Sequence, residues 1–94
     1  MRQFEWNDAK STRNQEKHGV SFEEAATVFD DPNALESFDA AHSLPDEDRF
    51  RLIGVSSVPR LLLVVYCERE EDTVRIISAR KATSSERQAY EGRG

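Results

Sequence analysis

Apolar and polar positions alternate through the C-terminal half of the chain with the two-residue period of β-strands. The pattern predicts strands at residues 48–56, 61–69 and 73–81, joined by segments short enough for hairpin turns. Residues 61–65 are all apolar, so the second of these strands is expected to lie between the other two, covered on both faces. A final helix is predicted at residues 83–90.

The N-terminal half predicts a short strand at residues 4–6, a helix at about residues 9–18 and a second helix that begins after Ser21. A weaker strand at residues 34–40 and an exposed loop at residues 41–47 follow. The resulting order, β-α-α-β-β-β-β-α, predicts an α+β fold in which helices pack on an antiparallel sheet. We expect one domain, because 94 residues are too few for two.

The segment Lys17-His18-Gly19-Val20 predicts a sharp corner between the two helices. Gly19 lacks a Cβ and suits the left-handed conformation that ends many helices. Ser21-x-x-Glu24 and Thr83-x-x-Glu86 match capping boxes, in which each side chain bonds the other residue's backbone N–H. The second helix carries an apolar stripe for packing on the sheet, formed by Phe22, Ala25, Ala26 and Phe29. Lys17 and His18 also complement the dipole of the helix they end.

The net charge of −5 is unevenly distributed along the chain. Residues 21–48 contain nine of the 18 acidic residues and none of the 13 basic ones. This asymmetry fits either a basic face for an anionic partner or two ordinarily solvated surfaces. The first helix leaves the same alternatives open, since one of its faces carries Lys10, Arg13, Asn14 and Lys17 with almost no apolar stripe.

Composition also restricts the class of protein. No apolar run approaches the ~20 residues of a membrane span, and the N-terminus lacks the apolar stretch of a signal peptide. The single cysteine, Cys67, cannot form an internal disulfide, so the cytoplasm is the favoured location. The sequence has neither a glycine-rich phosphate loop nor the spaced His or Cys pairs of a zinc site, so we expect no metal or cofactor.

Several strand residues could gather on one face of the sheet. Residues two apart on a strand share a face, which applies to the pairs Arg49 and Arg51, Tyr66 and Glu68, and Ser78 and Arg80. Arginine binds phosphate with two parallel hydrogen bonds, and a histidine such as His18 can give or take a proton near neutral pH. Ordinary structural explanations remain open: Glu68 could pair with Arg75 across the hairpin, and Tyr66 could be a core aromatic.

Four short motifs together resemble those of a known family. They are, in chain order, Phe4-x-Trp6-Asn7-x-x-Lys10; Asn14-x-x-Lys17-His18-Gly19-Val20-Ser21-Phe22-x-Glu24-Ala25; Arg49 with Ile53-Gly54; and Val74-Arg75-Ile76-Ile77-Ser78-Ala79-Arg80-Lys81-Ala82. In this order and spacing they resemble the BrnT family, over about residues 4–90. The resemblance implies a RelE-like fold, similar to microbial ribonucleases, which agrees with the predicted order of elements.

Members of the BrnT family are toxins of type II toxin–antitoxin pairs. The resemblance therefore implies a metal-independent endoribonuclease that slows translation and is neutralised by a BrnA-like antitoxin. Operator DNA would be bound only through the antitoxin. In the implied reaction a base removes the proton of a ribose 2′-hydroxyl, whose oxygen attacks the adjacent phosphorus and leaves a cyclic phosphate.

The resemblance and the strand pattern together suggest roles for eleven residues. The candidate catalytic residues are His18, Arg49, Glu68, Arg75 and Arg80, and the candidate substrate-binding residues are Lys10, Arg13, Lys17, Arg51, Tyr66 and Lys81. His18 or Glu68 would act as base or acid, while Arg49 and Arg80 would stabilise charge on the phosphate. Two alternatives remain: a non-catalytic domain that binds protein or RNA, and a toxin relic whose catalytic set has decayed.

Overall fold

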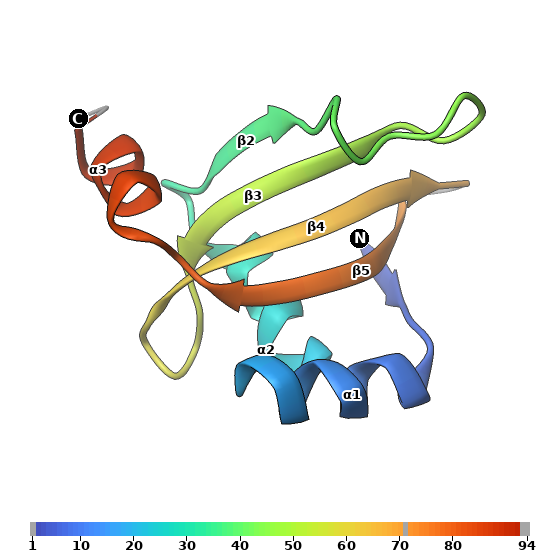
Figure 1. The fold of residues 1–94 in the computed structure, drawn as a ribbon, viewed down its shortest axis with the longest axis horizontal. Helices are drawn as coiled ribbons and strands as arrows, with labels where there is room; N and C mark the ends of the chain where they lie inside the picture. Colours follow the sequence, from blue (N-terminus) through green and yellow to red (C-terminus); the bar gives the residue numbers. More distant parts are fainter. Residues whose placement is uncertain (1, 71, 93–94) are drawn as a thin grey trace.

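The computed structural model describes residues 2–70 and 72–92, which form one five-stranded sheet and three α-helices (Figure 1). The elements are β1 (Gln3–Glu5), α1 (Asp8–His18), α2 (Phe22–Thr27), a 3-10 turn (Val28–Asp30), β2 (Leu35–Phe38), β3 (Arg49–Val55), β4 (Leu61–Arg69), β5 (Thr73–Lys81) and α3 (Ser84–Gly92). This order and the α+β class confirm the sequence-based prediction. Within the described residues, no helix is long and apolar enough to cross a membrane.

The strands lie in the order β1-β5-β4-β3-β2, so β4 is central, as its apolar sequence predicts. β2 to β5 form an antiparallel meander, but β1 runs parallel to β5, with Phe4 opposite Val74. The expectation of a wholly antiparallel sheet is therefore wrong at this edge. Hairpins force consecutive strands to run antiparallel, whereas β1 pairs with a strand distant in sequence, and no hairpin sets its direction.

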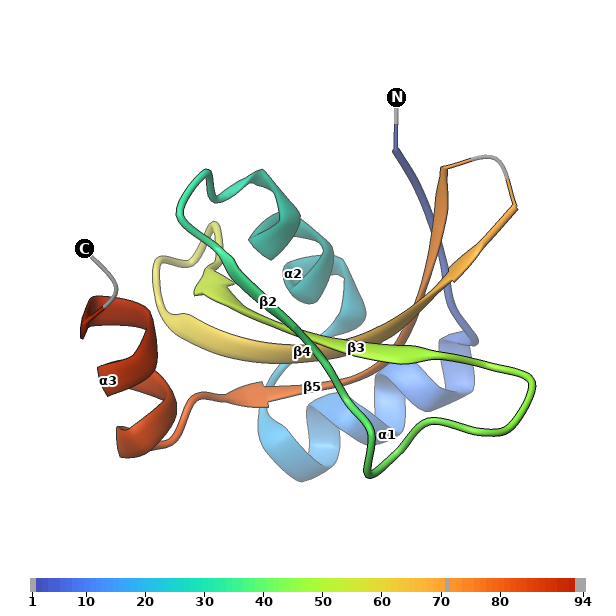
Figure 2. The ribbon, with the colours of Figure 1, turned by 90° about the horizontal axis from the view of Figure 1, so that it is seen from above.

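The two faces of the sheet are covered very differently (Figure 2). α2 and the 3-10 turn pack on one face and form the main core there, where Phe22, Ala25 and Val28 meet Leu62 and Val64. Among residues 2–70 and 72–92, the other face is covered by a helix only at one end, where Tyr90 of α3 packs near Ile53, Leu61 and Leu63. The rest of this face, called here the open face, is available for a site.

Hydrogen bonds anchor α1 beside β5, in place of the apolar stripe that this helix lacks. β1 pairs with β5 only as far as Arg75, so a strand does not cover the rest of that edge. There the side chain of Asn14 donates to the carbonyl of Ala79 (2.8 Å) and accepts the N–H of Ala79 (3.2 Å). It also donates to the carbonyl of Val20 (2.8 Å), which joins helix, corner and strand.

Arg60 also stabilises the corner between α1 and α2. Gly19 adopts the left-handed conformation (φ +72°), as predicted. Arg60 donates to the Gly19 carbonyl (2.7 Å) and to both carboxylate oxygens of Glu24 (2.6 and 2.7 Å). The predicted capping box at Ser21 is therefore only half formed: Ser21 accepts the N–H of Glu24, but the Glu24 carboxylate is engaged by Arg60 and Ser56. The hydrogen bond from Arg60 also lowers the pKa of Glu24.

Candidate active site

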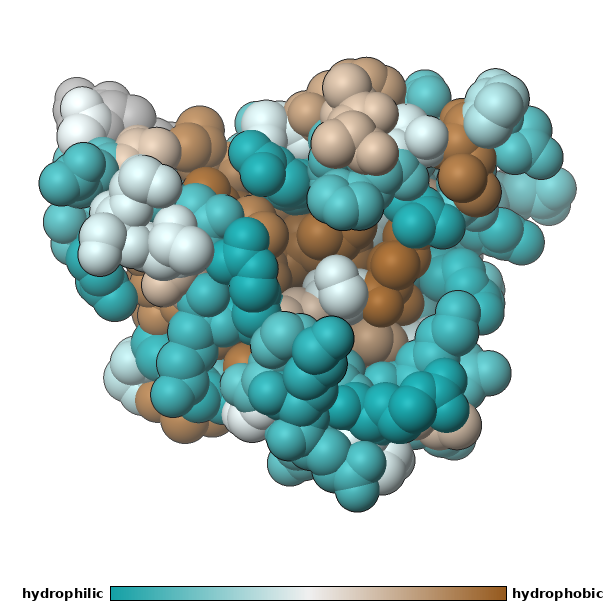
Figure 3. Space-filling view, viewed as in Figure 1, coloured by the Kyte–Doolittle hydropathy of each residue, from teal (hydrophilic) through white to brown (hydrophobic). Residues whose placement is uncertain are grey.

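A pocket of about 270 Å³ lies on the open face of the sheet. Leu63, Val65 and Ile77 contribute apolar lining. The polar and charged residues that line it are His18, Asp39, His42, Arg49, Arg51, Ser78 and Arg80. Figure 3 shows an apolar hollow near the centre of this face, framed by hydrophilic side chains. A small pocket with an apolar floor and several cations at its rim suits an anionic group.

Sheet register explains why these residues meet. Arg51 lies opposite Val65 on one side and opposite Ser37 on the other, and Val65 in turn lies opposite Ser78. A bulge follows on the β4–β5 pair, where Tyr66 is opposite Ile76 and the extra residue of β5 is Ile77. This extra residue allows both Ile77 and Ser78 to line the pocket. His18 reaches the pocket from the last turn of α1, beside β5.

The three arginines of the pocket differ in how far their charge is compensated. Arg49 pairs with Glu47 at 3.0 Å, and Arg80 forms two parallel bonds with Glu86 of α3 at 2.8 and 2.9 Å. Arg51 forms no ion pair with the residues the structure describes, and its buried Nε has no hydrogen-bond partner among them. An unsatisfied cationic donor is costly to bury. Arg51 is therefore the arginine best prepared to bind an incoming anion.

A basic groove continues from the pocket along α1. It is lined by Lys10, Arg13 and Lys17, and it shares His18, Ile77 and Ser78 with the pocket. The predicted basic face of α1 therefore exists and opens towards the site. Asn14, which the helical period places on that face, also lines the groove, but it is buried and its side chain bonds the backbone of β5.

Four of the residues suggested by sequence lie away from both the pocket and the groove. Tyr66 is buried in the main core, where burial and the carboxylate of Glu36, to which it donates, raise its pKa. Glu68 lies on the same face of the sheet as Tyr66. Arg51 lies on the other face, because it is opposite Val65, and side chains alternate along β4 from Val65 to Tyr66. Arg75 pairs with Glu5 of β1 (3.0 Å), not with Glu68.

Lys81 also falls outside the pocket. It alternates with Arg80 on β5 and so faces the opposite side, where its charge helps to lower the pKa of Glu24. Of the eleven residues suggested by sequence, the pocket and groove thus bring together seven: Lys10, Arg13, Lys17, His18, Arg49, Arg51 and Arg80.

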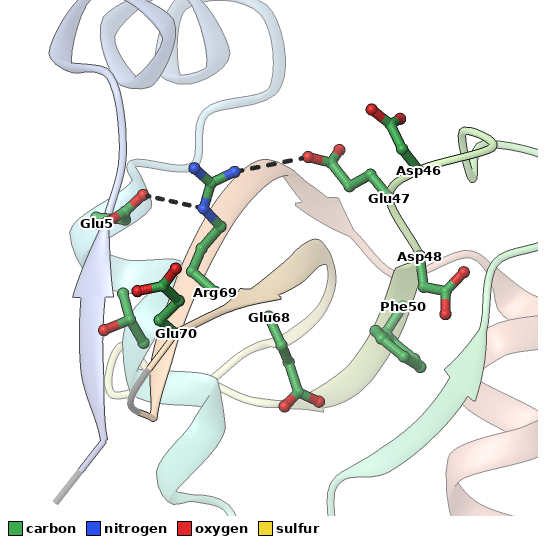
Figure 4. Close-up of a pocket in the computed structure, with 9 residues that line it drawn as sticks. Glu5, Asp46, Glu47, Asp48, Phe50, Glu68, Arg69 and Glu70 are labelled. Atoms are coloured by element: carbon green, nitrogen blue, oxygen red, sulfur yellow. Dashed lines mark ion pairs between the residues drawn. The ribbon is translucent and has the colours of Figure 1, made fainter.

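A larger hollow, of about 660 Å³, lies elsewhere and has the opposite charge (Figure 4). Its acidic lining consists of Glu5, Asp46, Glu47, Asp48, Glu68 and Glu70. Arg69 lies between Glu5 (3.9 Å) and Glu47 (3.8 Å) and compensates only part of this charge. The acidic hollow would repel a phosphate, so size alone is a poor guide to the site here.

Sequence reasoning missed two residues of the pocket, Asp39 and His42. They belong to the segment between β2 and β3, and Nδ1 of His42 lies 2.9 Å from a carboxylate oxygen of Asp39. Asp39 is 5% exposed, whereas His42 is 70% exposed. A spacing of three residues in an irregular segment has no periodic signal. The available indication was a histidine in the predicted loop at residues 41–47, close after an acid in the weaker predicted strand at residues 34–40.

The pair between Arg80 and Glu86 predicts a pH dependence of stability. The second predicted capping box is complete: Thr83 and Glu86 each accept the backbone N–H of the other, and Glu86 also binds Arg80. The bond from Arg80 is the main cause that lowers the pKa of Glu86 from 4.5 to about 2. Because the folded-state pKa lies below the unfolded value, the pair stabilises the fold above about pH 4.5, and this contribution is lost as the pH falls towards 2.

We therefore expect Glu86→Gln to lower the free energy of unfolding at pH 6 by on the order of 2 kcal/mol, and to flatten its decline below pH 4.5. Urea unfolding at pH 6, 4 and 3 measures both effects. Glu91→Gln is the matched control, since Glu91 is exposed on the same helix and pairs only at 3.6 Å with Arg87. If the free energy of unfolding of Glu86→Gln declined with falling pH as steeply as that of the wild type, Arg80 would not be the group that binds this carboxylate.

Comparison with known proteins agrees with the fold. Residues 6–86 match a family model for ribonuclease toxins of type II toxin–antitoxin systems. The family is BrnT, and because the match covers most of the chain, the chain belongs to it. Membership implies an antitoxin protein as partner and RNA as target.

Among solved structures, the chain is similar to the crystal structure of the Brucella abortus ribonuclease toxin BrnT. The TM-score is 0.66 at 20% sequence identity, over 89% of this chain and 100% of the other. At this identity the likeness concerns the fold. A comparison with curated proteins finds no match.

Proposed function

We propose that this chain is an endoribonuclease that cleaves RNA by attack of a ribose 2′-hydroxyl on the adjacent phosphorus, without a metal ion. The observation that carries the proposal is the pocket around Arg51, whose buried Nε has no partner among the described residues. This cation lies in one pocket with His18, at the end of the basic groove of α1. Such an arrangement suits a phosphodiester backbone that runs along α1 and places one phosphate in the pocket.

Each group has a role in this proposal. Lys10, Arg13 and Lys17 bind the backbone through charge. Arg51 binds the reacting phosphate. Arg49 and Arg80 stabilise the negative charge that grows on the phosphate oxygens, in place of a metal ion. His18 transfers one of the two protons that the reaction moves. Glu68, on the other face of the sheet, has no part in this mechanism.

The test is to incubate purified protein with RNA in EDTA and to analyse the fragments. We expect products with a 2′,3′-cyclic phosphate at one end and a 5′-hydroxyl at the other. Cleavage that needs added Mg²⁺ would refute metal independence. Intact RNA together with preserved binding of RNA or antitoxin would instead support a non-catalytic binding domain, and a chain that binds antitoxin but neither cleaves RNA nor arrests growth would be a relic.

We further propose that the antitoxin is BrnA-like, that it covers the open face and α1 in the cytoplasm, and that operator DNA is bound through it. The exposed groove of α1 and the uncovered pocket support this placement, because blocking them would exclude RNA. Hydrogen exchange of the complex should show protection in α1 and in β3 to β5. Unchanged exchange in those elements, with RNA cleavage still blocked, would place the antitoxin elsewhere.

A further inference from the structure

The pair Asp39–His42 is built like a proton-transfer group, although the basic site already described does not require it. Asp39 is 5% exposed, and its carboxylate accepts from Nδ1 of the imidazole at 2.9 Å. The ring itself is 70% exposed and lines the same pocket as Arg49 and Arg51. With Nδ1 engaged, Nε2 is the ring atom left to meet a substrate.

The backbone around the pair is fixed to the start of β3. The Asp39 N–H donates to the Arg49 carbonyl (2.8 Å), and the Arg49 N–H donates to the Ser43 hydroxyl (2.8 Å). The Ser43 hydroxyl in turn donates to the Asp39 carbonyl (2.8 Å). These bonds fix the irregular segment that carries His42 to Arg49, the first residue of β3. Catalytic groups need such fixed supports, because small displacements are costly.

Stability does not explain the pair. An ion pair with one exposed partner contributes about 0–1 kcal/mol, which does not offset the cost of burying the Asp39 carboxylate. A buried acid that orients the ring of an exposed histidine is instead the arrangement used in hydrolytic triads.

We infer that His42 exchanges a proton with the RNA through Nε2 and that Asp39 positions its ring. The inference rests on the proposed ribonuclease function and deepens it. In the reaction the bond from the 2′-oxygen to phosphorus forms and the bond from phosphorus to the 5′-oxygen breaks. One group takes the proton of the 2′-hydroxyl and another gives a proton to the departing 5′-oxygen. His42 and His18, the two histidines of the pocket, carry these two transfers.

The first test is His42→Ala, with Leu44→Ala as control because Leu44 is an exposed residue of the same segment outside the pocket. We expect His42→Ala to lower kcat by about 10²–10⁴-fold, and to leave unchanged the affinity for RNA with a 2′-deoxyribose at the cleavage site. Added imidazole should restore part of the lost rate. Cleavage within about threefold of wild type, or a loss that imidazole does not restore, would overturn the role of His42.

Asp39→Asn tests the positioning role separately. We expect kcat to fall by on the order of 10²-fold with KM within about twofold, because the amide supports the wrong ring orientation or tautomer. A merely structural role would instead lower the melting temperature and raise KM, and that result would overturn the positioning role. Failure of this inference is distinct from failure of the proposed function. Wild-type protein that leaves RNA intact would refute the ribonuclease function. His42→Ala protein that is fully active would refute only the role of the Asp39–His42 pair.

Discussion

Arg51→Ala is expected to reduce the rate of RNA cleavage by about 10²–10³-fold while leaving the fold as stable as before or slightly more stable. The guanidinium faces the pocket with a buried Nε that has no partner among the described residues, so its burial costs free energy in the unbound protein. A phosphate bound to the guanidinium would supply the negative charge that Arg51 lacks among the described residues. Removing the side chain therefore removes a destabilising group and a phosphate contact together, a trade-off typical of functional sites.

Single-turnover cleavage and urea unfolding of the same preparations measure the two effects. Arg87→Ala is the control for a lost positive charge, since Arg87 is exposed on α3 and lies outside the pocket. Arg51→Lys should recover only part of the activity, because an ammonium group cannot form two parallel bonds to phosphate. If Arg51→Ala cleaved RNA at the wild-type rate, the phosphate site would have to be sought elsewhere on the surface.

Asn14→Ala is expected to lower the free energy of unfolding by about 2–4 kcal/mol. The substitution removes three buried hydrogen bonds, and it leaves the N–H and carbonyl of Ala79 and the carbonyl of Val20 without the partner they have here. α1 has almost no apolar contact to replace them. For a domain of this size the loss corresponds to a fall in melting temperature of roughly 10–20 °C.

Gln15→Ala is the matched control, because Gln15 is an exposed neighbour on α1 and glutamine and alanine differ little in helix propensity. Thermal and urea unfolding of both variants should differ clearly. A loss below about 1 kcal/mol for Asn14→Ala would mean that water or a backbone shift satisfies β5 in its absence.

Much of the fold follows from periodicity. The strands predicted at residues 61–69 and 73–81 match β4 and β5 at both ends, because their alternation persists over nine residues and turns bound them. The predicted antiparallel direction of β1 was wrong, because pairing between strands distant in sequence leaves no local signal. The anchoring role of Asn14 was missed for the same reason, since its partner lies 65 residues away.

The lining of the candidate pocket was predicted in part. The two-residue period of strands correctly paired Arg49 with Arg51 on one face, but it could not relate that face to the one that carries Tyr66 and Glu68. Only the register of β3 against β4 shows that the two pairs face opposite sides. The contact between Asp39 and His42 depends on an irregular segment, where neither period applies.

The sequence by itself determined the elements, their order, the left-handed corner at Gly19 and the family resemblance. These properties depend on local spacing and on backbone preferences that each residue carries with it. The tertiary structure alone decided which cations share a pocket, which of them lack a compensating carboxylate and which histidine has a buried acid behind it. Those properties arise from strand register and from contacts across the fold, so residues far apart in the chain had to be brought together before the site at Arg51 existed.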